Sequence, residues 1–264
     1  MTSMPRRLAP ALAVALLGLA ALPVRSQPKP VERQSCGDYE ITPSGFAAGN
    51  RASRVSIQKA GRLMATVTDW AITDLECGDI TADAVPELVV RTFSGGAHCC
   101  ETVRVYALAD KPRLLLRYEA NNAMGVAVGD INGDGRGELT LGDDSFAYFR
   151  DLSYAASPRS LPLVACFREG RFEDCTREFP GLLQARRDEH VARLQPPADE
   201  QALQDVKGNA LAVVALSALL GQEEQGLDTV RKAVPDERVV GWLAKALPHV
   251  RDWMAARGKK LKDK

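Results

Sequence analysis

Short apolar runs, separated by polar turn residues, follow one another from Asp38 to about Thr176. They are rich in valine, leucine and tyrosine and are only a few residues long, which is typical of β-strands. The clearest of them cover residues 55–58, 62–67, 87–90, 102–106 and 113–118. Their short connections predict a small antiparallel β-domain.

The pattern changes after Phe179-Pro180, where apolar residues begin to recur at helical spacing. This periodicity predicts four helices, over residues 182–194, 199–220, 227–234 and 236–257. Histidines at 190 and 249 fall on these helices, where packing or surface positions are the default. The basic tail from Arg251 to Lys264 is expected to be a solvated helix end. The fold class is therefore α+β, with a C-terminal helical segment.

Residues 1–26 have the layout of a secretory signal peptide. Arg6 and Arg7 precede a mostly apolar run from Leu8 to Leu22, and small residues follow at Val24 and Ser26, after which we expect cleavage. The protein is therefore expected to be exported, to the periplasm or out of the cell. The chain then divides into a β-repeat domain at 27–180 and a helical segment at 181–264.

The charge balance bears on the choice of partner. The chain has 34 basic and 34 acidic residues, and removal of 1–26 takes away three arginines, so the mature chain carries a net charge of −3. This argues against a nucleic-acid partner. No later stretch is apolar and long enough to span a membrane. The partner expected here is a protein or a glycan.

All six cysteines lie after the signal segment, and an even number in an exported chain indicates disulfides. Sequence alone leaves several pairings open. We favour Cys166 with Cys175, because they flank a hairpin with its turn at Glu169-Gly170. Cys36 with Cys77 would then tie the first strands to a loop that begins at Asp79.

Residues 130–138 carry oxygen-bearing side chains at alternate positions around a glycine turn, and end on a carboxylate. This is the donor pattern that calcium requires. The sequence predicts ligands from the side chains of Asp130, Asn132, Asp134 and Glu138, and from the carbonyl of Arg136. The last acid comes at position nine rather than twelve, and apolar strand-like residues flank the loop, so it is not an EF-hand.

A second copy lies 51 residues earlier, at 79–87. Asp79, Thr81, Asp83 and Glu87 occupy the corresponding ligand positions. Thr81 is a weaker ligand than asparagine, and Ala84 replaces the turn glycine, where a positive φ would be strained. We expect weak calcium binding here, or a purely structural turn. Metal-free Asx turns are the alternative explanation for both loops.

The loop at 130–138 resembles those of FG-GAP and VCBS-type repeats, the blades of integrin alpha-subunit and related bacterial β-propellers. The resemblance covers about residues 70–145 and implies propeller-blade-like units with a role in adhesion or ligand binding. The family usually ends the loop in aspartate, whereas this chain has Glu138. The β-region has room for two or three such units.

A second unusual string, Thr92 to Cys100, contains Gly-Gly-Ala-His-Cys-Cys. We favour structural disulfide bonding for Cys99 and Cys100, either with each other or with separate partners, because a zinc site normally spaces its cysteines. The alternative is a small exported hydrolase or metal-handling protein that uses His98. No catalytic motif occurs, which favours a non-enzymatic, calcium-binding role in the cell envelope or outside the cell. Partner recruitment by the helical tail is a third possibility.

Overall fold

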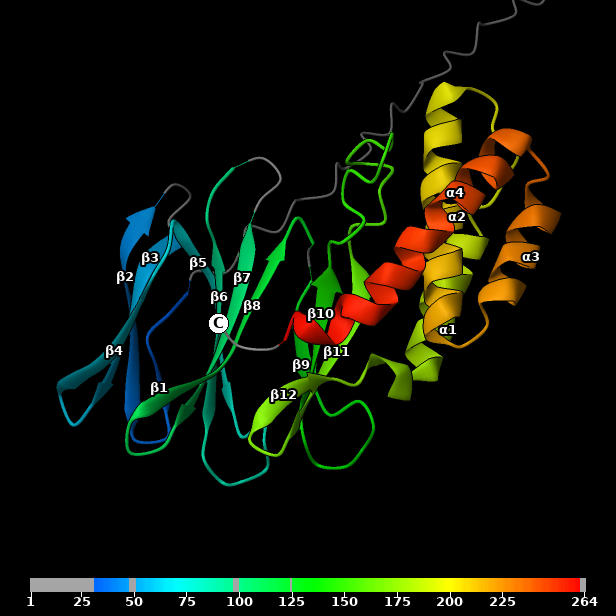
Figure 1. Ribbon diagram of the computed structural model, residues 1–264. Helices are drawn as coiled ribbons and strands as arrows, with labels where there is room; N and C mark the ends of the chain where they lie inside the picture. Colours follow the sequence, from blue (N-terminus) through cyan, green and yellow to red (C-terminus); the bar gives the residue numbers. More distant parts are fainter. Residues whose placement is uncertain (1–30, 48–50, 97–99, 124, 262–264) are drawn as a thin grey trace, which may run out of the picture.

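The computed structural model describes residues 31–47, 51–96, 100–123 and 125–261. Three small β-sheets stand side by side, and a group of helices covers the far side of the third sheet (Figure 1). The predicted signal peptide lies outside the described residues.

Each sheet has four antiparallel strands, and the order of the strands in space follows the chain. The strands of the first sheet are β1 (Gln34–Cys36), β2 (Tyr39–Ala47), β3 (Arg51–Lys59) and β4 (Arg62–Thr68). Those of the second sheet are β5 (Ala71–Gly78), β6 (Glu87–Phe93), β7 (Glu101–Leu108) and β8 (Pro112–Asn121). Those of the third are β9 (Ala127–Gly129), β10 (Glu138–Asp143), β11 (Leu161–Arg168) and β12 (Arg171–Asp174). The predicted strands are thereby confirmed.

Apolar side chains fill the space between neighbouring layers. Val55 and Ile57 of β3 pack with Leu88 and Val90 of β6 between the first two sheets. A second cluster joins the second and third sheets. In β3 alternate positions point into the core, and in β6 the two faces point into two different cores, as a period of two requires.

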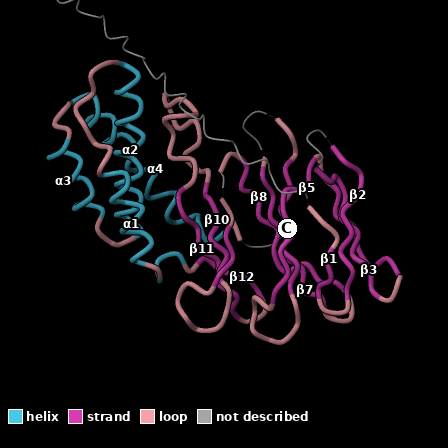
Figure 2. Tube along the Cα trace, turned by 180° about the vertical axis from the view of Figure 1, so that it is seen from behind, coloured by secondary structure: helices cyan, strands magenta, loops and turns pink. Residues whose placement is uncertain are grey.

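The helices are α1 (Pro180–Val191), α2 (Glu200–Leu219), α3 (Glu223–Ala233) and α4 (Glu237–Ala256), with single 3₁₀ turns at Thr176–Glu178 and Arg257–Lys259. All four predicted helices are confirmed, although α3 begins at Glu223 rather than at Leu227. Asp199 and Asp236 cap α2 and α4 by accepting backbone N–H bonds. Both views show α2 among the other helices (Figures 1 and 2), and most of its residues are buried.

The irregular segment 144–160 fills the space between the third sheet and the helices. Its Phe146 and Leu152 belong to the same buried cluster as residues of α1 to α4. The helical segment is therefore joined to the third sheet by a shared core. Among the described helices, none is long and apolar enough to cross a membrane.

The end of the chain departs from the expected solvated helix end. Arg257 is only 3% exposed, and Leu261 lies in the core between the second and third sheets. Asp143 and Asp174 accept hydrogen bonds from Arg257, which explains how this charge can be buried. The prediction was therefore wrong for Arg257, because its partners lie far away in the sequence.

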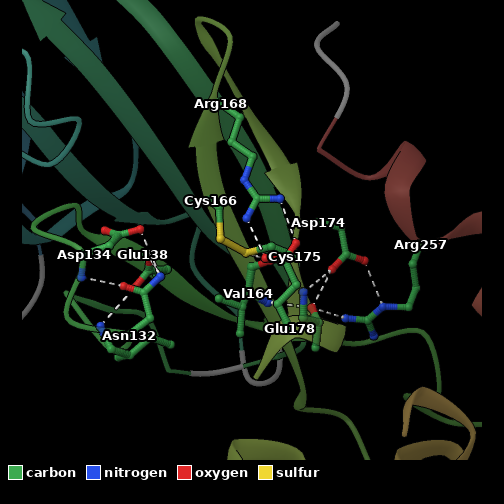
Figure 3. Close-up of a disulfide and its surroundings, with 12 residues drawn as sticks. Asn132, Asp134, Glu138, Val164, Cys166, Arg168, Asp174, Cys175, Glu178 and Arg257 are labelled. Carbon is green, nitrogen blue, oxygen red and sulfur yellow. Dashed lines mark hydrogen bonds and ion pairs between the residues drawn. A yellow bond between two sulfur atoms is a disulfide. The ribbon is translucent and has the colours of Figure 1, made fainter. Parts of the chain in front are cut away.

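Both favoured disulfides are present. Cys36 in β1 is bonded to Cys77 in β5, so this bridge links the first two sheets. Cys166 is bonded to Cys175, directly after β12, and closes the predicted hairpin (Figure 3). Two disulfides fit an exported protein, because such bonds persist in oxidising compartments.

Candidate metal-binding loops

The two candidate loops occupy equivalent places in successive sheets. Residues 79–87 connect β5 to β6 in the second sheet, and residues 130–138 connect β9 to β10 in the third. Each loop therefore turns the chain from the first to the second strand of its sheet, and each ends on a glutamate at the start of the next strand. The in-register repeat in the sequence corresponds to a repeat in the fold.

In the loop 130–138, Asp130 holds the turn together. Its Oδ1 accepts a hydrogen bond from the Gly133 N–H at 2.6 Å, and its Oδ2 accepts one from the Gly135 N–H at 2.9 Å. These bonds, led by that of Gly135, lower the pKa of Asp130 below its usual range. Asp130 is therefore held as a carboxylate at the mouth of the loop.

Asn132, Asp134 and Glu138 come together on the inner side of the same loop (Figure 3). Nδ2 of Asn132 lies 3.1 Å from Oδ2 of Asp134 and 3.4 Å from Oε1 of Glu138. The amide N–H₂ group thus lies between two carboxylates, where it supplies hydrogen atoms to their negative oxygens. A cation that bound between the carboxylates would take over this role.

Glu138 and Arg136 complete the loop. Glu138 is buried, and its Oε2 accepts a hydrogen bond from the Ile131 N–H at 2.9 Å. Arg136 is exposed, and its N–H donates to Oδ1 of Asp134 at 2.8 Å. The side chains of Asp130, Asn132 and Asp134 are exposed to solvent as well. An ion could therefore reach the loop from outside, while the buried glutamate closes it from within.

The loop 79–87 repeats these bonds. Oδ2 of Asp79 accepts from the Ala84 N–H at 3.0 Å, as Asp130 does from Gly135. Oε2 of Glu87 accepts from the Ile80 N–H at 2.8 Å. The Thr81 hydroxyl lies 3.4 Å from Oε1 of Glu87, in the place that the Asn132 amide takes in the other loop. Asp83 completes the copy by accepting the Val85 N–H at 2.9 Å.

The two loops also share their unusual backbone angles. Gly133 and Gly135 have φ of 79° and 85°, and the corresponding Ala82 and Ala84 have φ of 55° and 65°. Positive φ costs an alanine about 1–2 kcal/mol, whereas glycine adopts it freely. The expected strain at Ala84 is therefore present, and the fold keeps the loop shape in spite of it.

Glu87 differs from Glu138 in its surroundings. It is fully buried, and this burial raises its pKa, although N–H bonds from Thr81 and Ile80 act in the opposite direction. The charges of Asp83 and Asp79 raise the pKa further. In the first loop, the carboxylates of Asp79 and Asp83 therefore lie near Glu87, whose burial already makes its ionisation unfavourable.

The loops touch each other across the boundary between their sheets. The Gly137 N–H donates to the carbonyl of Ile80 at 2.8 Å, and a Cβ at Gly137 would come within 2.9 Å of Ile80 Cγ2. Pro86 precedes Glu87 as Gly137 precedes Glu138, and it too contacts the preceding sheet. A Cβ at Gly37, in the turn between β1 and β2, would come within 2.8 Å of Pro86 Cγ. The two loops are thus in direct contact through Ile80 and Gly137.

Within the described part of the chain, no group of three histidine, cysteine, aspartate or glutamate side chains lies close enough together to hold a metal ion. The donor set expected for residues 130–138 also includes an amide oxygen and a backbone carbonyl. The nine ligand positions, five in this loop and four in the first, stay predictions.

The alternative site around the Gly-Gly-Ala-His-Cys-Cys string is only partly described. His98 and Cys99 lie outside the described residues. Cys100 is disulfide-bonded, and its N–H donates to Oγ of Ser94 at 3.0 Å. The alternative role for His98 therefore stays a hypothesis.

Sequence reasoning missed an association between His190 on α1 and Asn209 on α2. Nδ1 of His190 lies 2.9 Å from Oδ1 of Asn209, at the wall of a cavity. The two residues lie on different helices, so no local spacing signalled their contact.

Comparison with known proteins gives distant relatives. The chain is 26% identical over 187 residues to a protein of Synechocystis sp. named as a probable thylakoid lumen protein, an alignment that covers 67% of this chain and 54% of the relative. It is 25% identical over 215 residues to an uncharacterised protein of Sinorhizobium fredii, covering 74% of this chain and 32% of that protein. The aligned part is thus about half or less of each relative. No family model and no solved structure matches.

Proposed function

We propose that this is an exported calcium-binding module, in which one ion at residues 130–138 stiffens a stack of β-sheets that serves binding or envelope structure. The observation that carries the proposal is the arrangement at Asn132. Its amide lies between the carboxylates of Asp134 and Glu138, in the place where a cation would be attracted by both.

The chemistry of the donor set fits calcium. Three carboxylates, one amide and the Arg136 carbonyl are all oxygen donors, which a hard cation prefers. The three carboxylates are not gathered closely enough to hold an ion in this structure, so binding would have to draw them together. To ligate through oxygen, the Asn132 amide would have to give up its hydrogen bonds to the carboxylates and turn its Oδ1 inward. The ion would compensate by neutralising carboxylates that otherwise repel one another.

The first loop is proposed as a structural copy that no longer depends on metal. Thr81 takes the place of the amide, and its hydroxyl donates to Glu87. Ile80 and Thr81 supply backbone N–H bonds to the same carboxylate. These bonds can hold the turn without an ion.

An extracytoplasmic location follows from the same proposal. The two disulfides support it, and so does the name of the Synechocystis relative, which refers to a lumen. Periplasm and medium are both compatible with this location, and a protein or a glycan is the proposed partner.

The three sheets are proposed to be blade-like units of FG-GAP or VCBS type. In support, each is a four-stranded meander, and equivalent turns carry the two loops. The outer face of the first sheet presents Thr42, Ser56 and Thr66 in register, and it also exposes the apolar side chains of Phe46 and Leu63. The helices cover the other end of the stack.

The proposal is tested by thermal unfolding of the oxidised chain with calcium and with a chelator. A ligand at 100 times its Kd stabilises the folded state by about 2.7 kcal/mol, which is easily measured as a rise in Tm. We expect this rise for the natural chain and for Asp83→Ala, and its loss in Asp134→Ala. The two variants remove equivalent side chains from the two loops. A rise of equal size in all three proteins would contradict the assignment to residues 130–138.

A further inference from the structure

A cavity of about 600 Å³ lies between the segment 155–161 and helices α1 and α2, and no residue of either loop lines it. Its polar wall is formed by Arg159, His190, Arg193, Asp205 and Asn209. Polar and charged side chains from three separate segments thus converge on one hollow. Such convergence is typical of a small-molecule site.

The wall of the cavity is set by a close approach of backbone to backbone. Gly208 of α2 faces the carbonyl of Ala156, and a Cβ at Gly208 would come within 1.8 Å of that oxygen. Only glycine allows the segment 155–161 to lie against the helix in this way. The position of Arg159 over α2 therefore depends on a residue that is itself part of the cavity wall.

Two guanidinium groups give the cavity an excess of positive charge. Arg159 stacks on the Tyr154 ring, with its Cζ 4.3 Å from the ring centroid, and bonds to the Tyr154 carbonyl at 3.1 Å. These contacts fix its position without neutralising it. Within the described residues, Arg193 has no ion-pair partner, and Asp205 is the single acidic group of the wall. The site thus favours an anion, and guanidinium groups match carboxylates especially well.

His190 adds a hydrogen-bond acceptor. The Asn209 side-chain N–H₂ donates to the carbonyl of Asp205 at 2.7 Å, which leaves its Oδ1 to face Nδ1 of His190 at 2.9 Å. Because an amide oxygen can only accept, Nδ1 carries the hydrogen, and Nε2 of the neutral ring has a free lone pair. Burial lowers the pKa of His190 below its usual value, and the positive charge of Arg193 lowers it as well. The hydrogen bond to Asn209 acts in the opposite direction but does not outweigh them. The ring is therefore neutral at physiological pH.

We infer that this cavity binds a small organic carboxylate that also carries an N–H or O–H donor next to its acid group. Arg159 and Arg193 would bind the carboxylate, and Nε2 of His190 together with Asp205 would accept hydrogen bonds from the neighbouring donor. This site is independent of the calcium loops, and its test does not depend on them.

Three four-carbon dicarboxylates make a matched set of probes: L-aspartate, L-malate and succinate carry an ammonium group, a hydroxyl and a hydrogen at the same carbon. Calorimetric titration of the full oxidised chain with each is expected to show binding of aspartate or malate, and binding of succinate that is at least about tenfold weaker. Absence of binding by all three would overturn the inference. Equal affinity for all three would overturn the role of His190 and Asp205.

Variants locate the site. Arg193→Ala is expected to weaken binding about tenfold or more, whereas Arg186→Ala, on α1 and outside the cavity, should leave the Kd unchanged. Asn209→Ala should reduce the preference over succinate, because Nδ1 of His190 then loses the acceptor that keeps its hydrogen on Nδ1 and leaves Nε2 free to accept. Unchanged binding by Arg193→Ala, or an unchanged preference in Asn209→Ala, would contradict the assignment.

Discussion

The Trp253 indole donates a hydrogen bond to Oδ2 of Asp143 at 2.8 Å, which joins the end of β10 to the last turns of α4. Asp143 is fully buried and also accepts from Arg257 and Lys260. Arg257 in turn donates to the carbonyl of Pro162 at 2.8 Å. One buried carboxylate therefore fastens the end of the helical segment to the third sheet.

Replacement of Asp143 by asparagine should be strongly destabilising. It leaves buried Arg257 without one of its two carboxylate partners, and loss of one member of a buried ion pair typically costs about 3 kcal/mol or more. The free energy of unfolding, measured by denaturant titration, should fall accordingly. Asp228→Asn is the matched control, because Asp228 pairs with Arg231 at an exposed position and such pairs contribute little. Equal effects of the two changes would contradict the role given to Asp143.

The Asp143 carboxylate should also make the free energy of unfolding depend on pH. Burial works to raise the pKa of Asp143, but Lys260 and Arg257 outweigh it, so its pKa lies below the usual value. Its contribution is complete above the unfolded-state pKa of about 3.9 and is lost as the pH falls through the lower folded-state pKa. The difference in unfolding free energy between the natural chain and Asp143→Asn should therefore shrink below about pH 4. A difference that stayed constant down to the acid limit would show that the charge is not responsible.

Exchange of residues between the two loops tests the strain at positive φ. Ala84→Gly should stabilise the protein by about 0.5 kcal/mol, because relief of strain exceeds the added entropy of the unfolded chain. Gly135→Ala should destabilise the protein by about 0.5–1 kcal/mol, because it introduces the same backbone strain. No steric clash adds to this cost, since no atom lies within 4 Å of the new Cβ. Chemical denaturation in the absence of calcium would measure both changes in unfolding free energy. Stabilisation by Gly135→Ala would show that the loop relaxes to another conformation.

Gly208 and Gly241 make a second matched pair, within two helices of equal length. Gly208→Ala should destabilise the fold by about 2 kcal/mol or more, because the new Cβ would overlap the Ala156 carbonyl. The new Cβ of Gly241→Ala would have no atom within 4 Å, so this change should be neutral or should stabilise the fold by up to about 1 kcal/mol. Thermal unfolding of both variants measures the contrast. A neutral Gly208→Ala would mean that the segment 155–161 is free to move away from α2.

Local patterns predicted much of this fold. The alternation in segments such as 102–106, and the helical spacing of Val239, Leu243 and Val250, depend on neighbours in the chain, so the sequence displays them directly. The Cys166–Cys175 bridge was predictable for the same reason, because a short hairpin brings both residues together. The donor positions of the two loops were visible as a repeat, and their shared hydrogen bonds follow from it.

Contacts between distant segments were not predictable in this way. Asp143 and Trp253 are 110 residues apart, and nothing near Arg257 indicated that its charge would be buried. The cavity beside His190 likewise requires α1, α2 and the segment 155–161 to meet. Such sites depend on how whole layers pack, which residue spacing within one segment does not encode.

The central claim is that residues 130–138 bind calcium, and calorimetric titration of the mature, oxidised chain with calcium tests it most directly. Asp134→Ala and Asp83→Ala serve as the paired variants. The account predicts one strong site in the natural chain and in Asp83→Ala, and none in Asp134→Ala. Absence of binding heat in the natural chain, or a site that survives in Asp134→Ala, would contradict it and leave both loops as metal-free Asx turns.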